Sequence, residues 1–335
     1  MPHQQHESAT HREVGQVYLV NSILLLKQFA AILLIFIGAF FIMWISNWSG
    51  VMPKKTQLGD PDSTIISTKA RLATTSNQKN IAFVGDSSCL VNIHIPTMND
   101  NGIDAVNLGT LSYLGIDSFG LLAQRFCKNK SDAQIFLVLH PECIRMVASS
   151  SDHRKILMEA LDPATDSSTH FQLSNLRKIT VDDFSSRLLD GWLPVPVKGR
   201  LGYRYGFTRN LRSEIISTGG FMEETSRFDA SGFHGSSDYR IARRVQNECA
   251  LFRSYLPKGV RVHLLVSPIP QSHATRGHEK QILEMRSEIG KWIQSENPSK
   301  NMPTVLPDSS FGTVTHLLPN SAREYTQQLC LMFSK

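Results

Sequence analysis

The chain has 335 residues, of which 41% are hydrophobic and 19% charged, and these proportions are ordinary for a folded protein. The net charge of +6 comes without a basic tract, so it does not argue for nucleic-acid binding and supports only a mild preference for anionic surfaces or glycans. None of the five cysteines forms a Cys-x-x-Cys pair, so metal-ligand spacing is absent. We expect no metal and no cofactor, and the odd cysteine count leaves at least one free thiol.

The N-terminal part combines a polar tail with a long apolar run. Residues 1–16 are polar, and from Gln28 to Trp48 there is no formal charge. About 20 apolar residues at about 1.5 Å each cross a hydrocarbon core of about 30 Å. We therefore predict an uncleaved transmembrane anchor over 17–48. A cleaved signal peptide is disfavoured because the region before the apolar core is too long and no small-x-small site comes after it.

The flanking charges give little information on the orientation of this anchor. Positive charges lie on both sides of the apolar run, so the positive-inside rule barely decides. A large domain comes after a single N-terminal anchor, which favours an N-terminus on the cytoplasmic side. We therefore predict a cytoplasmic tail at 1–16, a stalk and lead-in helix at 49–79, and a domain at 80–335 on the periplasmic or extracellular side of the cytoplasmic membrane.

From residue 80, short apolar runs alternate with helical patterns. The runs predict strands at 81–84, 103–109, 133–139, 260–266 and 304–306, and the patterns between them predict helices at 116–126, 238–255 and 276–294. Apolar strands separated by helices imply an α/β domain whose parallel sheet is covered on both faces. Ligands of such sheets bind beyond the carboxyl ends of the strands, where Gly85, Gly109 and His140 fall.

An insertion at 145–235 interrupts this alternation. It has little periodicity, and its run 200–209 interleaves arginines with aromatic residues, among them Arg204 and Tyr205. Such side chains suit sugar stacking or anionic groups, and we expect Arg204 and Tyr205 to bind substrate. The alternative interpretation is a solvated lid or docking surface with buried aromatic bodies.

The stretch Asn80–Ser88 organises the domain. Four apolar residues end at Gly85, which indicates a buried strand that stops at a tight turn. Asp86, Ser87 and Ser88 then offer side chains that cap a helix start. A serine on such a turn lies at the positive end of a helix dipole, beside N–H groups that can bind an oxyanion. We expect Ser87 to be a nucleophile; the alternative is an ordinary junction with capping serines.

A second candidate group lies near the C-terminus, where His316 stands just before a helix opened by Pro319. Histidine suits general-base work because its pKa lies near neutral, and serine is a poor nucleophile without such a base. A surface loop histidine is the competing interpretation.

Together these segments resemble the SGNH (GDSL-type) hydrolase superfamily over about 80–330, with the insertion unmatched. Three segments carry the resemblance, namely Gly85-Asp86-Ser87-Ser88, Asn107-Leu108-Gly109, and His316-Leu317 followed by Pro319-Asn320-Ser321-Ala322. The resemblance implies a flavodoxin-like three-layer sandwich with a parallel sheet. It also implies that Ser87 attacks an acyl carbonyl, that His316 takes its proton, and that the N–H groups of Ser87 and Gly109 stabilise the oxyanion.

Two positions depart from the family pattern. The family usually has an aspartate three residues before the histidine, where this chain has Thr313, and Asp308 is a possible substitute. The family also commonly has an asparagine after the third strand as an oxyanion donor. Here His140 stands there and can donate a hydrogen bond, whereas ionised Glu142 cannot.

A membrane-anchored domain of this kind resembles the helper proteins of surface-polysaccharide acylation, such as those of alginate O-acetylation and teichoic acid D-alanylation. Those proteins work beside a multi-pass membrane-bound O-acyltransferase. The resemblance therefore implies an acyltransferase or esterase that acts on a surface or exported glycan. The alternatives are an anchored general esterase or lipase, and a non-catalytic glycan-binding or assembly protein with a degenerate site.

Overall fold

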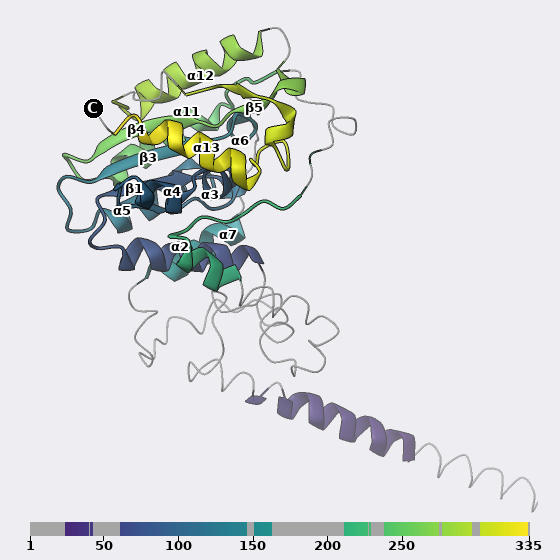
Figure 1. Cartoon of the computed structure of the whole chain (residues 1–335). Helices are drawn as coiled ribbons and strands as arrows, with labels where there is room; N and C mark the ends of the chain where they lie inside the picture. Colours follow the sequence, from purple (N-terminus) through teal and green to yellow (C-terminus); the bar gives the residue numbers. More distant parts are fainter. Residues whose placement is uncertain are drawn as a thin grey trace, which may run out of the picture. The chain divides into compact units, whose positions relative to one another are not determined.

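The computed structural model describes residues 24–39, 41–42, 61–145, 151–162, 211–226, 228, 238–274, 277–296 and 302–333 (Figure 1). The described residues from 61 onward belong to one compact unit and residues 24–39 to another. Residues 24–39 are helical with mostly exposed side chains. Within the described ranges, no helix has both the length and the apolar character that crossing a membrane requires. The tail at 1–16 and the remaining parts of the predicted anchor lie outside these ranges.

Four parallel strands form the main sheet, in the order β2-β1-β3-β4. Their bounds are β1 (Ile81–Gly85), β2 (Ala105–Asn107), β3 (Gln134–Leu139) and β4 (Arg261–Val266). The predicted α/β class with a parallel sheet is thereby confirmed, and the strand order is consistent with a flavodoxin-like sandwich. The chain order reverses between β1 and β3, and the crevice outside the carboxyl ends of such a strand pair is where ligands of open α/β sheets bind.

The described helices include α2 (Pro61–Thr75), α3 (Ser87–Asn92), α4 (Ile95–Asp100), α5 (Ile116–Phe126), α6 (Pro141–Arg145), α7 (Ser151–Leu161), α11 (Arg244–Tyr255), α12 (His278–Trp292) and α13 (Pro319–Cys330). Three short 3-10 helices are η2 (Ser112–Leu114), η7 (Gln271–His273) and η9 (Asp308–Ser310). The strand predicted at 304–306 is β6 (Val305–Leu306). It pairs with β5 (Ile269–Pro270) in a separate two-stranded sheet.

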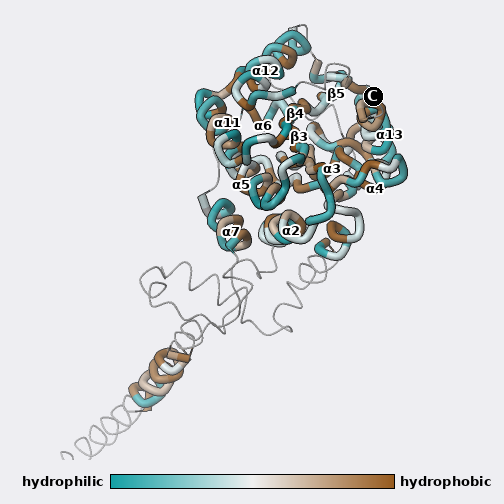
Figure 2. The backbone as a smooth tube through the Cα atoms, turned by 90° about the vertical axis from the view of Figure 1, so that its left-hand side faces the viewer, coloured by the Kyte–Doolittle hydropathy of each residue, from teal (hydrophilic) through white to brown (hydrophobic). Residues whose placement is uncertain are grey.

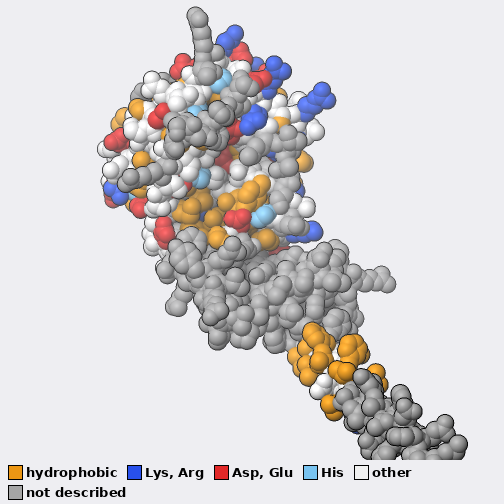
Figure 3. Space-filling model, turned by 90° about the vertical axis from the view of Figure 1, so that its right-hand side faces the viewer, with side chains coloured by type: hydrophobic (Ala, Val, Ile, Leu, Met, Phe, Trp, Pro, Cys, Tyr) orange, Lys and Arg blue, Asp and Glu red, His pale blue; other side chains and the backbone are white. Residues whose placement is uncertain are grey.

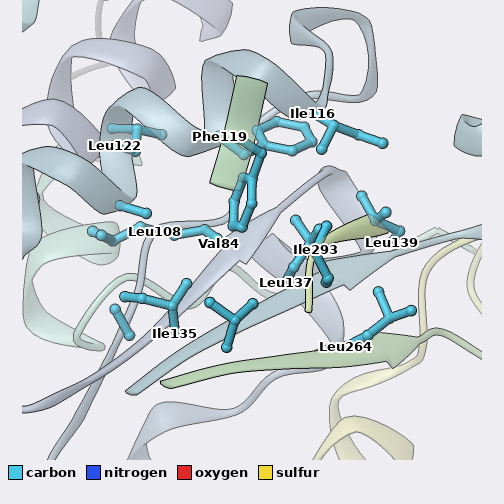
Figure 4. Packing of buried hydrophobic residues seen from close by; sticks show 14 of the residues in the cluster. Val84, Leu108, Ile116, Phe119, Leu122, Ile135, Leu137, Leu139, Leu264 and Ile293 are labelled. Atoms are coloured by element: carbon cyan, nitrogen blue, oxygen red, sulfur yellow. The ribbon is translucent and has the colours of Figure 1, made fainter. Parts of the chain in front are cut away.

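The sheet is buried on both faces, which explains why its strands are apolar runs without alternation. Along β3, Ile135 and Leu137 belong to one core cluster and Phe136 to the other. Helices α5, α11 and α12 lie on one side of the strands, and α4 and α13 on the other (Figure 2). Figure 4 shows the first cluster, in which Phe119 of α5 packs over Val84 of β1.

Candidate active site

The residues that directly follow three parallel strands are linked by hydrogen bonds at the carboxyl edge of the sheet, one of the links passing through Ser88. Asp86 follows β1, His140 follows β3 and Ser267 follows β4. The backbone N–H of His140 donates to Asp86 Oδ2 at 2.7 Å. Ser267 Oγ lies 2.8 Å from Ser88 Oγ, which in turn donates to Asp86 Oδ1 at 2.6 Å. This buried network, the Asp86 cluster, fixes the turn after β1 relative to the neighbouring strands.

The same aspartate begins helix α3. Asp86 is its N-cap, and its Oδ1 accepts the backbone N–H of Ser88 at 2.8 Å, as the sequence predicted for a capping side chain. The turn also needs Gly85, because a Cβ at that position would lie 1.9 Å from the Val138 carbonyl oxygen on β3. The close approach of β1 to β3 therefore sets where α3 starts.

The two adjacent serines have different surroundings. Ser88 is fully buried and hydrogen-bonded within the Asp86 cluster. Ser87 is the one residue between Ala82 and Ile95 that is not buried. The fold thus uses Ser88 as a structural hydroxyl and presents Ser87 at the edge where a ligand can reach it.

The loop of His316 is attached to the far end of α3. Asn92 donates from Nδ2 to the Thr315 carbonyl at 3.1 Å and accepts the Leu317 N–H at 2.8 Å, so it holds the backbone on both sides of His316. Thr313 Oγ1 accepts the His316 backbone N–H at 3.2 Å. Thr313, at the position of the family's aspartate, therefore shapes the loop and does not hold the imidazole ring.

A carboxylate that the sequence did not reveal holds that ring. His316 Nδ1 lies 2.7 Å from Glu224 Oε2, and the side chains are only 19% and 13% exposed. The other oxygen of Glu224 accepts the Ser226 N–H at 2.7 Å. The hydrogen bond from His316 is the main cause that lowers the pKa of Glu224 to about 2, so the carboxylate is ionised at neutral pH.

Asp308 does not have the role that the sequence assigned to it as a possible orienting carboxylate. Its Oδ1 accepts the N–H of Ser272 at 2.9 Å, at an exposed position. The structure gives that role to Glu224, which lies 92 residues before His316 in the chain. Glycine at 312 makes room for it, because a Cβ there would lie 2.5 Å from Glu224 Cγ and 2.8 Å from the Ser226 carbonyl.

The hydrogen bond at Nδ1 decides which nitrogen of His316 carries the proton. Because Nδ1 donates to Glu224, Nε2 carries the lone pair in the neutral ring. Nε2 is buried and has no hydrogen-bond partner among the described residues. It is therefore not bonded to Ser87 Oγ, a contact that is often loose in sites without substrate. The arrangement leaves an oriented imidazole whose loop is held at the C-terminal end of α3, the short helix that begins with Ser87.

His140 links the two parts of this site. Burial first, and then the charge of His316, lower the pKa of His140 to about 3, so the two rings are within electrostatic reach and His140 is neutral. Its Nδ1 accepts the Glu142 N–H at 3.1 Å, which leaves the proton on Nε2. That atom is buried and makes no hydrogen bond within the described part of the chain. The Pro268 backbone carbonyl acts on this ring in the opposite direction and raises its pKa, so it lies near the ring's N–H. The role of oxyanion donor therefore stays a prediction.

Gly109 is engaged in another way than the sequence suggested. Its N–H, expected to face an oxyanion, donates to Asn107 Oδ1 at 2.8 Å. A Cβ at this position would lie 2.4 Å from the Leu90 backbone nitrogen. In this conformation the glycine lets the end of β2 pack against α3, and its N–H is not free for a substrate.

Figure 3 shows one face of the molecule, on which histidine side chains appear among acidic and hydrophobic ones. Arg204 and Tyr205, predicted to bind substrate, lie outside the described residues. No group of three or more His, Cys, Asp or Glu side chains that could hold a metal ion occurs in the part of the chain that the structure describes. All five cysteines are buried, and none of them is in a disulfide.

Comparisons with protein-family models, with curated proteins and with solved structures find no match for this chain. Support for a function therefore comes from the geometry of these side chains.

Proposed function

We propose that this chain is a serine-dependent O-acyltransferase or esterase of the SGNH type, acting on a cell-surface or exported glycan. One observation carries the proposal: the Glu224–His316 pair leaves His316 Nε2 without a partner among the described residues, on a loop that is held at the C-terminal end of the helix that begins with Ser87. A carboxylate, an imidazole and a hydroxyl in these roles form the constellation of serine hydrolases, which recurs on unrelated folds.

In the proposed reaction, Ser87 Oγ attacks the acyl carbonyl carbon while His316 Nε2 accepts the hydroxyl proton. The tetrahedral intermediate collapses, its carbon–oxygen bond to the leaving alcohol breaks, and His316 returns the proton to that alcohol. An acceptor hydroxyl of the glycan, or water, then attacks the acyl-serine with His316 again as base. Glu224 holds the ring in the required tautomer and stabilises the imidazolium that forms in each step.

Two N–H groups are suited to the charge that develops on the carbonyl oxygen. Ser87 is the first residue of α3, so its backbone N–H has no partner within the helix. His140 carries its proton on Nε2 at the end of β3, where an oxyanion would compete with the Pro268 carbonyl for it. Removing one such donor typically costs roughly 10²–10³ in rate.

The Glu224–His316 pair also bears on the alternatives. The threonine at 313 favoured a non-catalytic glycan-binding protein, because it cannot supply charge. Glu224 supplies that charge from another segment, and this weighs against a degenerate site. An anchored general esterase differs from a transferase only in which acceptor reaches the acyl-serine, so the site geometry is the same for both.

The location and partners belong to the same proposal. The apolar N-terminal run would hold the domain at the outer face of the cytoplasmic membrane as a single-pass anchor. There it would work beside a multi-pass membrane-bound O-acyltransferase that delivers the acyl group, as the resemblance to surface-polysaccharide acylation proteins implies. The support for this part is the sequence pattern alone.

The test compares the two adjacent serines in cells that carry the acylated polymer. We expect Ser87→Ala to abolish polymer acylation, by about 10³-fold or more, because the nucleophile is lost. Ser88→Ala should retain acylation and lower stability by about 1–3 kcal/mol, because it leaves buried partners in the Asp86 cluster unpaired. Polymer ester content and the amount of protein in the membrane fraction are the readouts. Unchanged acylation in Ser87→Ala would favour the binding-protein alternative.

A further inference from the structure

Helix α2 contains a lysine that the proposed reaction does not use. Lys69 is fully buried. Its Nζ donates to the carbonyl of Asn107 at 2.9 Å and to the carbonyl of Gly220. Burial lowers the pKa of this amine to about 7, against the opposing influence of nearby Cys89. Both carbonyls accept N–H groups of this buried amine.

The two carbonyls belong to different parts of the fold. Asn107 is the last residue of β2, whereas Gly220 lies in the turn that ends a helical stretch at 211–217. The turn contacts β2 directly, since the Asn107 N–H donates to the Gly219 carbonyl at 2.9 Å. Gly220 has φ +108°, and a Cβ on it would lie 1.9 Å from the Asn107 carbonyl oxygen.

This turn leads straight to the catalytic carboxylate. Two residues after Gly220, the Met222 N–H donates to the Leu90 carbonyl of α3 at 3.1 Å. Glu224 comes two residues later and reaches His316. The segment 218–224 is thus fixed to β2 and α3, and the side chain of Lys69 joins its turn to β2 from a third element, α2.

We infer that Lys69 is the positioning residue for Glu224, and that docking of the segment 218–224 through this buried amine is what completes the site. Lys69 has no access to substrate, so its effect on the reaction acts only through the place of the carboxylate. The inference deepens the proposed function and rests on it for its catalytic consequence, but its geometric content does not depend on any activity.

The test measures Glu224 directly, in the full-length chain labelled with ¹³C at glutamate carboxyl carbons. The Glu224 resonance is assigned by its absence in Glu224→Gln. In the wild type we expect this carboxyl to titrate near pH 2, and in Lys69→Met near the ordinary value of 4.5. The methionine fills the volume of the lysine stem but leaves both carbonyls without their donor.

Lys79→Met is the matched control. Lys79 Nζ also donates to a carbonyl of β2, that of Ala105 at 2.7 Å, and it pairs with Asp104. These contacts lie at the start of β2, whereas Gly220 contacts Asn107 at its end. We expect this variant to leave the titration of Glu224 near pH 2. If Lys69→Met does not fold, Gly220→Ala tests the same docking, because the added Cβ displaces the turn from Asn107 without changing a titratable group.

The kinetic readout separates the inference from the proposed function. If both hold, Lys69→Met lowers kcat by the same factor as Glu224→Gln, and the double variant loses no more. A Glu224 carboxyl that still titrates near pH 2 in folded Lys69→Met would overturn the inference, and so would the same result in Gly220→Ala where Lys69→Met does not fold. A shifted carboxyl in a chain whose wild type transfers no acyl group would support the positioning role and contradict the proposed function.

Discussion

Two buried polar groups at the carboxyl edge of the sheet differ in how completely they are satisfied. In the Asp86 cluster, the carboxylate of Asp86 accepts three hydrogen bonds, and Ser88 and Ser267 bond to each other. In the Glu224–His316 pair, both oxygens of the carboxylate are bonded, but His316 Nε2 has no partner in the described part of the chain. The carboxylate of Asp86 and both serine hydroxyls of the first group are bonded, whereas the imidazole of the second is bonded at one nitrogen only.

We infer from this difference that the Asp86 cluster holds the fold and that the Glu224–His316 pair serves the proposed reaction. Leaving a buried polar atom unpaired is costly, and native proteins rarely do so without a functional reason. The Asp86 cluster is assembled from residues at the ends of adjacent strands. The Glu224–His316 pair joins two segments far apart in sequence, so its geometry depends on how the segment 218–224 docks. Variants of the Asp86 cluster should therefore chiefly lower stability, whereas variants of the Glu224–His316 pair should chiefly lower activity.

The largest difference between the Asp86 cluster and the Glu224–His316 pair is expected in the kcat of Glu224→Gln. The amide keeps the shape of the side chain but removes the charge that stabilises the imidazolium, and we expect kcat to fall by about 10²–10⁴. Stability at neutral pH should fall as well, because the ionised carboxylate paired with His316 adds stability there and the amide does not. The measurement is single-turnover acyl transfer or hydrolysis with an activated ester, together with urea unfolding.

Two controls accompany this variant. Asp308→Asn changes the carboxylate that the sequence suggested, and Glu223→Gln changes the exposed neighbour of Glu224. Both should retain kcat within about twofold, since neither side chain holds the His316 ring. A large loss in Asp308→Asn together with a small one in Glu224→Gln would reverse the assignment.

A smaller effect is expected in acid. The pKa of Glu224 is lowered to about 2 from an ordinary 4.5, chiefly by the hydrogen bond from His316. A carboxyl group with a depressed pKa in the folded state adds stability that is present above about pH 4.5 and is lost as the pH falls toward 2. The stability of the wild type should therefore fall more steeply in this window than that of Glu224→Gln. Urea midpoints at several pH values measure this, and parallel curves would contradict the pairing.

The main sheet was predictable because its strands are buried on both faces. A strand of that kind is a continuous apolar run, and the runs at 133–139 and 260–266 match β3 and β4 closely. The helix predicted at 116–126 coincides with α5. The turn after β1 could be predicted from Gly85 and Asp86, because a strand that ends in glycine before a capping residue is a local signal.

Glu224 was not predictable in the same way. It lies in an insertion without helical or strand period, and its position depends on packing between distant segments. Gly219 and Gly220, which permit that packing, were the local signal that the sequence offered. At Gly109 the local signal was ambiguous, because a glycine after a strand suits an oxyanion donor and a close packing contact equally well. The structure has the close packing contact.

The central claim is that His316, oriented by Glu224, activates Ser87, and covalent labelling tests it most directly. The full chain is treated with a fluorophosphonate, and the modified residue and its labelling rate are determined by peptide mass spectrometry. We predict an adduct on Ser87 and not on Ser88, abolished in His316→Ala and slowed by about 10²-fold or more in Glu224→Gln. Labelling of Ser87 at equal rates in all three proteins, or an adduct on Ser88, would contradict this claim.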